Sequence, residues 1–180
     1  AQQVQHRESS EFKKDKLKVL AELTKLRQIC CDPRLHYEDY KAGSAKLDTC
    51  MELVHGALDG GHRVLLFSQF TGMLDIIGKR LAKEDIAFLK LAGASSKESR
   101  AKMVAQFQAG EVPVFLISLK AGGVGLNLTA ADVVIHYDPW WNVAAQDQAT
   151  DRAHRIGQQH TVTVYKLIAK DTIEERIMQM

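Results

Sequence analysis

The sequence predicts an α/β domain, built on a parallel β-sheet with helices on both faces and preceded by a helical appendage. Two observations predict this fold class. Short apolar runs of strand length alternate along the chain with longer segments that repeat apolar residues at helical spacing. The strand runs are also continuously apolar, as in 114–118 (VFLIS), which is typical of strands buried on both faces. Strands and helices in alternation therefore predict a parallel sheet covered on both sides.

The appendage is predicted to be one helix over residues 11–30, where apolar residues recur at helical spacing and lysines and arginines lie among them. The helix should end before Asp32-Pro33, because the residue that precedes a proline disfavours the α region. Residues 32–45 show no periodicity and form a connector. We therefore divide the chain into an appendage with its connector, 1–43, and a main domain, 44–180.

The main domain is predicted to contain five strands and five helices. The predicted strands are Val64–Phe67, Ala87–Leu91, Val114–Ser118, Asp132–His136 and Val162–Ile168. The predicted helices are one capped by Ser44 that stops at Gly60-Gly61, Thr71–Leu81, one opened by the capping-box pattern of Ser95–Glu98, a stretch near 143–153, and Asp171–Met180. No internal repeat or low-complexity segment appears.

Composition and charge exclude several classes of protein. Hydrophobic residues make up 46% of the 180 residues and the formal net charge is only +2, so the chain can bury a core and any basic footprint must be local. No apolar run approaches the roughly 20 residues of a membrane span. The three cysteines, Cys30, Cys31 and Cys50, form no C-x-x-C pair, so we expect no metal site and buried thiols in a reducing compartment.

Ligands of parallel α/β sheets bind outside the carboxyl ends of the strands, and the unusual loops of this sequence follow those ends. The first, 118–128 (SLKAGGVGLNL), has three glycines after a buried strand, which allow backbone N–H groups to approach a phosphate. It is neither the P-loop that grips a triphosphate nor a G-x-G-x-x-G motif. From these residues alone, a structural turn explains the loop as well as a ligand site does.

Two further loops leave similar alternatives open. The two tryptophans in 138–142 (DPWWN) suit packing in a core or interface, or a platform for nucleic acid. In 148–158 (QATDRAHRIGQ), Arg152 and Arg155 are spaced i, i+3 and are predicted to share a helix face. Two guanidinium groups suit a phosphoryl group, because their planar donors meet its oxygens bidentately. The alternative is a solvated basic face paired with Asp147 and Asp151.

Taken in order, these loops resemble a known family. The sequence LLFSQFTGMLDII is followed by LAGASSKESRAKMVAQF, LISLKAGGVGLNLTAADVVIHYDPWWN, QATDRAHRIGQ and VYKLIAKDTIEERI. This series is similar to the C-terminal RecA-like domain of the Swi/Snf ATPases, a branch of the superfamily-two helicases. The segment LTKLRQICCDPRL resembles the part of the family that leads into this lobe, so the likeness runs from about Leu17 to the end of the chain. It implies a RecA-like fold for 44–180 and a preceding lobe before 1–43.

The resemblance also implies roles for individual residues. Arg152 and Arg155 match the arginine fingers that stabilise charge on the transferred phosphoryl group. The positions implied to lie at the ATP are Gln148, Asp151, Gly125 and Asn127. The positions implied to contact the DNA backbone, without reading its sequence, are Ser68, Gln69, Gly93, Ser118, Lys120, Gly122, Gly123 and Trp141.

The chain has no P-loop lysine and no acidic D-E-x-H-type motif, which in the resembled family belong to the first lobe. We therefore expect this chain alone to bind no nucleotide stably and to be inactive, with ATP and Mg²⁺ bound in the two-lobe enzyme. Its implied partners are that first lobe and the backbone of double-stranded DNA, along which closure of the lobes drives translocation without unwinding. We expect a monomer, in the cytoplasm or nucleoid of a bacterium or in the nucleus of a eukaryote.

Two alternative functions remain at this stage. The chain can instead be a stand-alone, non-catalytic DNA-binding module that uses Lys120, Trp141 and the lysine-rich helix at 11–27. It can also be a docking module whose terminal helices are surfaces for the missing first lobe.

Overall fold

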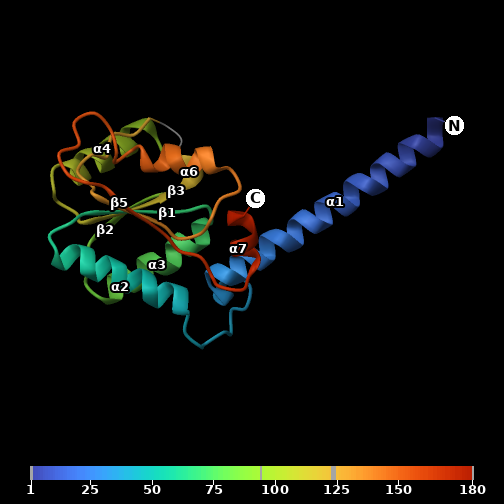
Figure 1. The fold of residues 1–180 in the computed structure, drawn as a ribbon, viewed down its shortest axis with the longest axis horizontal. Coiled ribbons are helices and arrows are strands. Elements are labelled where there is room, and N and C mark those ends of the chain that lie inside the picture. Colours follow the sequence, from blue (N-terminus) through green and yellow to red (C-terminus); the bar gives the residue numbers. More distant parts are fainter. Residues whose placement is uncertain (1, 94, 123–124, 180) are drawn as a thin grey trace.

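The computed structural model describes residues 2–93, 95–122 and 125–179. Its centre is one parallel sheet with the strand order β2-β3-β1-β4-β5 (Figure 1). The strands are β1 (Val64–Ser68), β2 (Phe88–Leu91), β3 (Val114–Ser118), β4 (Val133–His136) and β5 (Thr163–Lys166). Each lies within one or two residues of its predicted bounds, and the predicted parallel α/β fold is confirmed.

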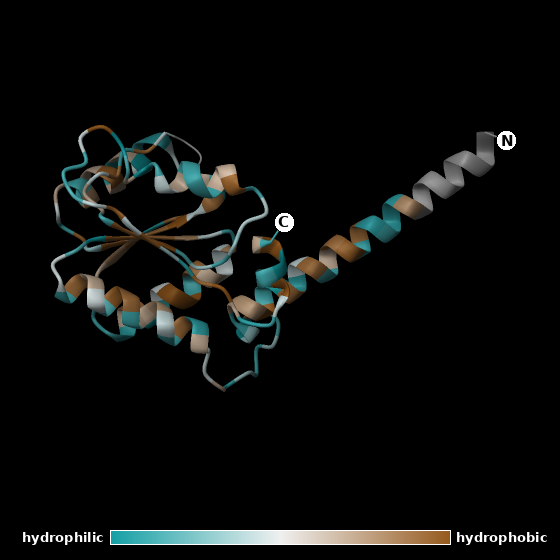
Figure 2. Ribbon diagram, in the orientation of Figure 1, coloured by the Kyte–Doolittle hydropathy of each residue, from teal (hydrophilic) through white to brown (hydrophobic). Residues whose placement is uncertain are grey.

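Helices cover both faces of the sheet (Figure 1). On one face lie α2 (Ala45–Asp59) and α3 (Thr71–Lys83), and on the other lie α4 (Lys97–Gln108) and α6 (Val143–Thr150). Successive strand residues point to opposite faces, so each face has its own core. Leu66 and Ile135 pack with α2 and α3, whereas Leu65 and Val134 pack in the cluster that includes Phe107 of α4. Figure 2 shows these apolar strands between the two helix layers.

The predicted helix starts are largely confirmed. The Ser44 side chain accepts a hydrogen bond from the Leu47 N–H at 3.2 Å, and α2 stops at Gly60 as its C-cap. Helix α4 begins one residue later than its capping pattern predicts: Ser96 is the N-cap and accepts from the Ser99 N–H at 3.1 Å. The pattern was misread because two adjacent serines offer two possible caps.

Three further features go beyond or differ from the predicted elements. A single helical turn, α5 (Leu119–Gly122), opens the glycine-rich loop, with the Ser118 hydroxyl accepting from the Ala121 N–H at 3.2 Å. Strand β5 is exposed along its length, since within the described residues it pairs only with β4. The final helix, α7 (Ile173–Met178), is shorter than predicted because Thr172 is its N-cap.

Helix α1 (Gln2–Cys31) is longer than its predicted 11–30 and projects away from the sheet domain (Figure 1). It ends before Asp32-Pro33, as predicted, and a short 3₁₀ turn, η1 (Pro33–Leu35), follows. The apolar side chains of Leu17 and Leu20 are 65% and 48% exposed, so the amphipathic pattern does not mark burial in this domain. In the part of the chain that is described, no helix has both the length and the apolar character to cross a membrane.

Candidate functional site

The carboxyl edge of the sheet brings together the loops that follow β1 and β4. Asp138, two residues after β4, is buried and accepts hydrogen bonds from the Ser68 hydroxyl at 2.5 Å and from the Gln69 N–H at 3.2 Å. Burial raises the pKa of the Asp138 carboxyl, while the bonds from Ser68 and Gln69 act in the opposite direction. The Gln69 side chain donates to the Pro139 carbonyl at 3.1 Å. These bonds fix the two loops against each other.

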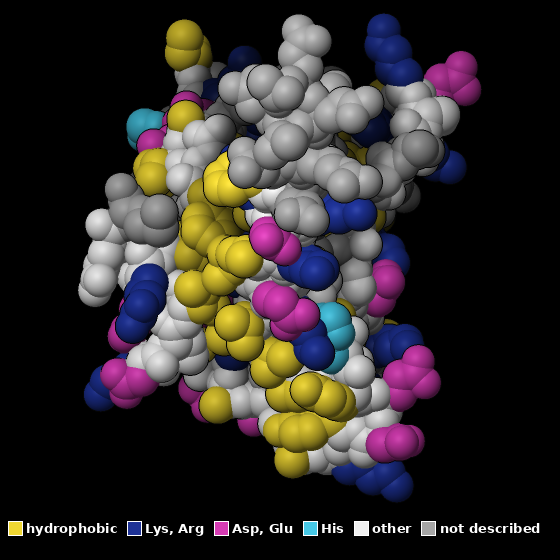
Figure 3. All heavy atoms as spheres, turned by 90° about the vertical axis from the view of Figure 1, so that its right-hand side faces the viewer, with side chains coloured by type: hydrophobic (Ala, Val, Ile, Leu, Met, Phe, Trp, Pro, Cys, Tyr) yellow, Lys and Arg dark blue, Asp and Glu magenta, His cyan; other side chains and the backbone are white. Residues whose placement is uncertain are grey.

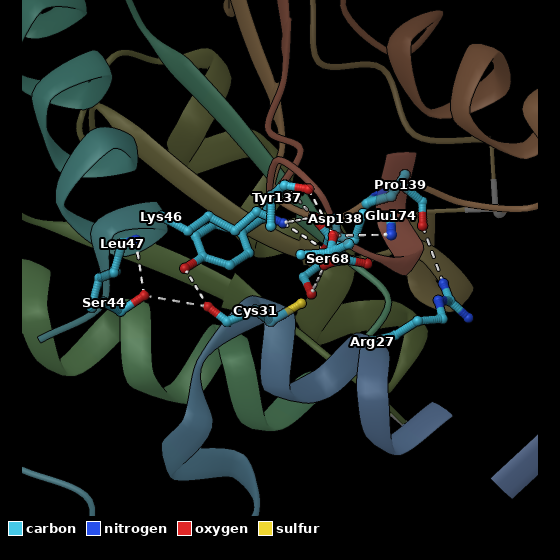
Figure 4. A network of polar contacts seen from close by, with 12 residues as sticks. Arg27, Cys31, Ser44, Lys46, Leu47, Ser68, Tyr137, Asp138, Pro139 and Glu174 are labelled. Carbon is cyan, nitrogen blue, oxygen red and sulfur yellow. Dashed lines mark hydrogen bonds and ion pairs between the residues drawn. The ribbon is translucent and has the colours of Figure 1, made fainter. Parts of the chain in front are cut away.

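The base of α1 joins the same cluster through Arg27, which is only 6% exposed (Figure 4). Its guanidinium donates to the Pro139 carbonyl at 3.1 Å and lies 4.9 Å from the ring centroid of Trp141. Burial lowers the Arg27 pKa, and the Asp138 charge opposes this shift. The Trp141 side chain remains 42% exposed. The indole therefore has a basic group on one side and accessible surface for a ligand.

A second set of buried polar contacts supports this base from the α2–α3 face (Figure 4). The Lys46 ammonium lies 2.6 and 2.7 Å from the two carboxylate oxygens of Glu174 in α7. Tyr137 donates its hydroxyl hydrogen to the Cys31 carbonyl at 2.9 Å, and the Lys46 ammonium lies 5.3 Å from the Tyr137 ring centroid. We call these four residues with Arg27 and Asp138 the α1-base network. They are spread from residue 27 to residue 174 and converge at one end of α1.

The two arginines predicted as fingers lie beyond α6, in turns of residues 151–158 that we call the arginine loop. Helix α6 ends at Thr150, so Arg152 and Arg155 do not share a helix face and that expectation is wrong. The loop leaves the helix because it pairs with the glycine-rich loop instead. The Arg152 carbonyl accepts from the Leu128 N–H at 2.9 Å, and the Arg155 guanidinium donates to the Leu126 carbonyl at 3.3 Å.

The arginine loop nevertheless holds two positive charges close to each other. Burial lowers the pKa of Arg152, and the charge of Arg155 lowers it further, whereas Asp151 acts in the opposite direction. Arg152 is buried and Arg155 is exposed. Two mutually repelling guanidinium groups beside a glycine-rich loop form a place where a multiply charged anion is favoured.

Gln158 is a residue of this site to which the sequence pattern assigned no role. Its side-chain amide nitrogen lies 3.0, 2.8 and 3.0 Å from the carbonyl oxygens of Thr129, Ala131 and Ala153. Its amide oxygen accepts from the His160 N–H at 3.0 Å. Gln158 thus joins the arginine loop to the segment after the glycine-rich loop. The carbonyls that accept from Gln158 lie in two separate segments of the chain, so sequence spacing does not reveal these bonds. The only sequence signal for Gln158 is its position at the end of QATDRAHRIGQ.

His136, at the end of β4, lies below α6. Its Nε2 is 2.9 Å from the Thr150 hydroxyl oxygen, and its ring stacks on Phe67 with centroids 5.5 Å apart. Burial lowers the pKa of His136 to about 4, and the Lys166 charge contributes in the same direction. Its Nδ1 and the side-chain nitrogen of buried Gln146 have no hydrogen-bond partner within the described structure. His136 is therefore a neutral imidazole that supports the start of the arginine loop.

The remaining predicted positions divide between surface and interior. Exposed positions around the arginine and glycine-rich loops are Lys120, Gly125, Asn127, Gln148 and Asp151. Gly93 has a φ of 72°, which favours glycine, and its carbonyl accepts from Arg100 at 3.2 Å. Gly122 ends α5, and Gly123 lies outside the described residues.

The hydroxyls of Ser68 and Ser118 are buried and bonded within the protein, unlike a side chain that faces a ligand. In this conformation the exposed groups nearest to them in sequence are Lys120 and the partly exposed Gln69. Among the described residues, no group of three histidine, cysteine or acidic side chains is placed to hold a metal ion.

Comparison with known proteins agrees with this geometry. Residues 45–157 match the model of the helicase conserved C-terminal domain. An uncharacterized ATP-dependent helicase of Mycoplasma pneumoniae is 44% identical over 168 residues, which are 93% of this chain and 16% of that protein. The human chromatin-remodeling ATPase INO80 is 52% identical over 120 residues, 66% of this chain and 8% of that protein. The chain thus spans about a sixth or less of the length of these relatives.

A solved structure shares the fold as well. The Sulfolobus solfataricus SWI2/SNF2 ATPase core in complex with double-stranded DNA matches with a TM-score of 0.79 and 39% identity, over 92% of this chain and 36% of that one. A five-stranded parallel sheet that helices cover on both faces defines a RecA-like lobe of the helicase type. The chain belongs to the helicase C-terminal domain family, in its Swi2/Snf2 branch.

Proposed function

We propose that this chain is the second ATPase lobe of a DNA-dependent ATPase that translocates on double-stranded DNA. The observation that carries the proposal is the pairing of the arginine loop with the glycine-rich loop through Arg152 and Arg155. In the proposed mechanism ATP with Mg²⁺ is held mainly by a first lobe, and this pair of charges reaches it across a cleft. The guanidinium groups then stabilise the charge that develops on the transferred phosphoryl group.

Gly125 and Asn127 of the glycine-rich loop, Gln148 of α6 and Asp151 of the arginine loop are proposed to contact the nucleotide. We propose that Asp151 orients the arginines, and its charge does oppose the lowering of the Arg152 pKa. Names of relatives support the use of ATP: the M. pneumoniae protein is described as an ATP-dependent helicase and INO80 as an ATPase. The chemistry that this chain supplies is electrostatic, and the nucleotide grip and the metal ligands belong to the first lobe.

The DNA contacts are proposed to lie along the carboxyl edge of the sheet, in the loops that follow β1, β2, β3 and β4. Lys120 supplies an exposed charge to a phosphate, Trp141 supplies a ring at the groove, and Gln69 and Gly93 supply uncharged donors and backbone. A structure of a relative in complex with double-stranded DNA supports this assignment. Binding of this kind is independent of sequence and weakens steeply with salt.

Helix α1 is proposed to dock against the first lobe. Its exposed large hydrophobic residues are Phe12, Leu17, Val19, Leu20 and Leu26. Figure 3 views the molecule from the side on which α1 projects and shows hydrophobic side chains beside charged ones on this face. Exposed large apolar side chains gathered on one helix are typical of an interaction surface. Because α1 precedes the domain in the chain, the first lobe is the partner that we expect to pack against its exposed apolar residues.

The test is the rate of ATP hydrolysis with and without linear duplex DNA, for this chain alone and joined to its first lobe. We expect the chain alone to show no ATP hydrolysis, and we expect DNA to raise the rate of ATP hydrolysis by the joined protein. In the joined protein, Arg155→Ala should lower the DNA-stimulated rate by about two orders of magnitude or more, by analogy with other arginine fingers. The matched control is Arg176→Ala, which removes an exposed arginine from α7.

The outcomes separate the proposed functions. Full activity of Arg155→Ala would count decisively against the finger assignment. Hydrolysis by the chain alone would reveal a complete nucleotide site within these residues and refute the half-site mechanism. Tight DNA binding by the chain alone, without ATPase activity in the joined protein, would favour the stand-alone binding module.

A further inference from the structure

We propose that Arg27 is a positioning residue that couples the orientation of helix α1 to Trp141 and Gln69. This inference rests on the proposed function, in which those two side chains contact DNA and α1 leads from the first lobe. It assigns to α1 a task beyond docking: it transmits the relative position of the lobes to the groups that hold DNA.

The first support is the number of elements that meet at one guanidinium. Arg27 donates to the Pro139 carbonyl at 3.1 Å, and its central carbon lies 4.9 Å from the Trp141 ring centroid and 5.6 Å from that of Phe70. The same carbonyl accepts from the Gln69 side chain at 3.1 Å. One acceptor is thus shared by α1 and by the loop after β1 (Figure 4). A displacement of Arg27 must either break these contacts or move Pro139 and Trp141 with it.

The second support is the electrostatic cost of the arrangement. Arg27 is 6% exposed, and burial lowers its pKa. An apolar side chain of similar length would fill the site without desolvating a charge. The planar guanidinium supplies a directed hydrogen bond and a cation–π contact in one fixed geometry, whereas an ammonium has no plane to orient and an apolar chain supplies neither contact. The site therefore uses a group that specifies geometry.

The third support is the contrast along α1. Lys25, two residues earlier, is exposed, and so are the apolar side chains of Leu20 and Leu26. Arg27 is the point at which a projecting helix becomes fixed to the carboxyl edge of the sheet. When the lobes close around nucleotide, α1 turns about this base, and Arg27 carries the rotation to the Trp141 ring. The nucleotide state is thereby coupled to the affinity for DNA, although Arg27 contacts neither ATP nor DNA.

The first experiment observes the coupling without DNA or ATP. The chain is labelled with 5-fluorotryptophan, and the ¹⁹F resonance of Trp141 is assigned with a Trp141→Phe variant. Arg27→Met and Arg27→Lys should both shift the Trp141 resonance, because both lose the planar group over the ring. Lys25→Met removes an exposed charge two residues away and should leave the resonance in place. An unchanged Trp141 signal in both Arg27 variants would overturn the proposal.

The second experiment uses the protein joined to its first lobe and measures ATPase rate against DNA concentration. Arg27→Met should raise the DNA concentration that gives half-maximal stimulation by about five- to tenfold, with the maximal rate changed less than twofold, a shift that matches the usual size of coupling between sites. Arg27→Lys should fail to restore it, because lysine lacks the fork. If Arg27→Met does not fold, Arg27→Lys alone carries both measurements.

The salt dependence of DNA binding distinguishes positioning from direct contact. If Arg27 touched a phosphate, its loss would reduce the slope of log affinity against log salt by about one, and lysine would rescue. We expect an unchanged slope and no rescue, and the opposite result would overturn the proposal.

Failure of the proposed function has a different signature. If Trp141→Ala and Gln69→Ala left DNA stimulation intact, the DNA contacts would be misassigned, whereas the ¹⁹F result would still report on Arg27.

Discussion

The residues at the end of β4 make different kinds of contact on the two faces of the sheet. On the α2–α3 face, Tyr137 belongs to the α1-base network, a buried set of contacts that includes the Lys46–Glu174 ion pair. On the other face, His136 supports the arginine loop, which is held by main-chain carbonyls and one glutamine amide. Much of that loop is exposed.

The difference shows how one strand end serves two tasks. The α1-base network joins segments far apart in the chain through charges that are almost fully desolvated, so a small displacement is costly. The arginine loop makes contacts that can be exchanged for water or for a ligand at low cost. The first arrangement suits a rigid joint, and the second suits groups that must adjust to an anion. The predictions below probe this contrast from the larger to the smaller effect.

The largest expected effect on stability is that of Lys46→Met. The lysine and glutamate side chains are 8% and 1% exposed, so removal of the ammonium leaves a buried carboxylate without its partner. Breaking such a pair destabilises a protein by about 3–5 kcal/mol. Urea denaturation monitored by circular dichroism measures the loss. Lys41→Met, in the exposed connector, should change the free energy of unfolding by less than about 0.5 kcal/mol.

The double variant Lys46→Met/Glu174→Leu sharpens this test. Because it removes both charges, it should regain most of the stability that Lys46→Met loses. A cost of Lys46→Met no greater than that of Lys41→Met would show that the α1-base network is not the rigid joint described above.

The second effect is a dependence of stability on pH from His136. Its pKa is lowered from an ordinary value of 6.5 to about 4 in the folded state, so the unfolded chain binds a proton first as pH falls. The stabilisation is present above pH 6.5 and is lost as pH falls toward 4. Between pH 7 and pH 5 the loss from this residue amounts to about 2 kcal/mol.

Urea denaturation of the protein and of His136→Gln at the two pH values measures this difference. The variant should lack the part of the pH dependence that belongs to the histidine, while the carboxylates titrate equally in both proteins. His160→Gln is the matched control, since the His160 side chain is exposed. Parallel pH profiles of the protein and His136→Gln would show that this imidazole is protonated as readily in the folded state as in the unfolded chain.

The fold was predictable wherever a single segment carries its own signal. The continuous apolar run of β3 and the helical spacing of Met73, Leu74, Ile77 and Leu81 led directly to buried elements, and all four of these helix residues are fully buried. Helix α1 also repeats apolar residues at near-helical spacing, yet Leu17, Leu20 and Leu26 are exposed. Periodicity reports that a helix has an apolar side, and it does not report which body covers that side.

The sequence predicted which loops form the candidate site, but it did not predict the contacts that hold those loops in place. The glycine-rich and tryptophan segments follow β3 and β4 at the carboxyl edge of the sheet, where a parallel topology places ligand sites. The arginine segment instead connects α6 to β5 and bonds to the residues that lead into β4. The role of Arg27 depends on a carbonyl 112 residues away, and that of Lys46 on a carboxylate 128 residues away. Neither partner is marked by spacing, because such pairs are formed by tertiary packing alone. The assumed helix face of Arg152 and Arg155 was wrong for the same reason, since bonds to residues 126 and 128 compete with the helix.

The smallest of these effects is expected at Gln158, which tests whether the arginine loop is the adjustable region. Gln158→Ala removes the amide that bridges the carbonyls of Thr129, Ala131 and Ala153. Gln158 is itself partly exposed, and its amide has only two hydrogens for the three carbonyls, so the free energy of unfolding should fall by only about 1 kcal/mol. In the joined protein the ATPase rate should fall more than stability implies, because the two arginines lose their fixed geometry. A loss of stability as large as that of Lys46→Met, measured by the same denaturation, would instead place the arginine loop among the rigid parts of the molecule.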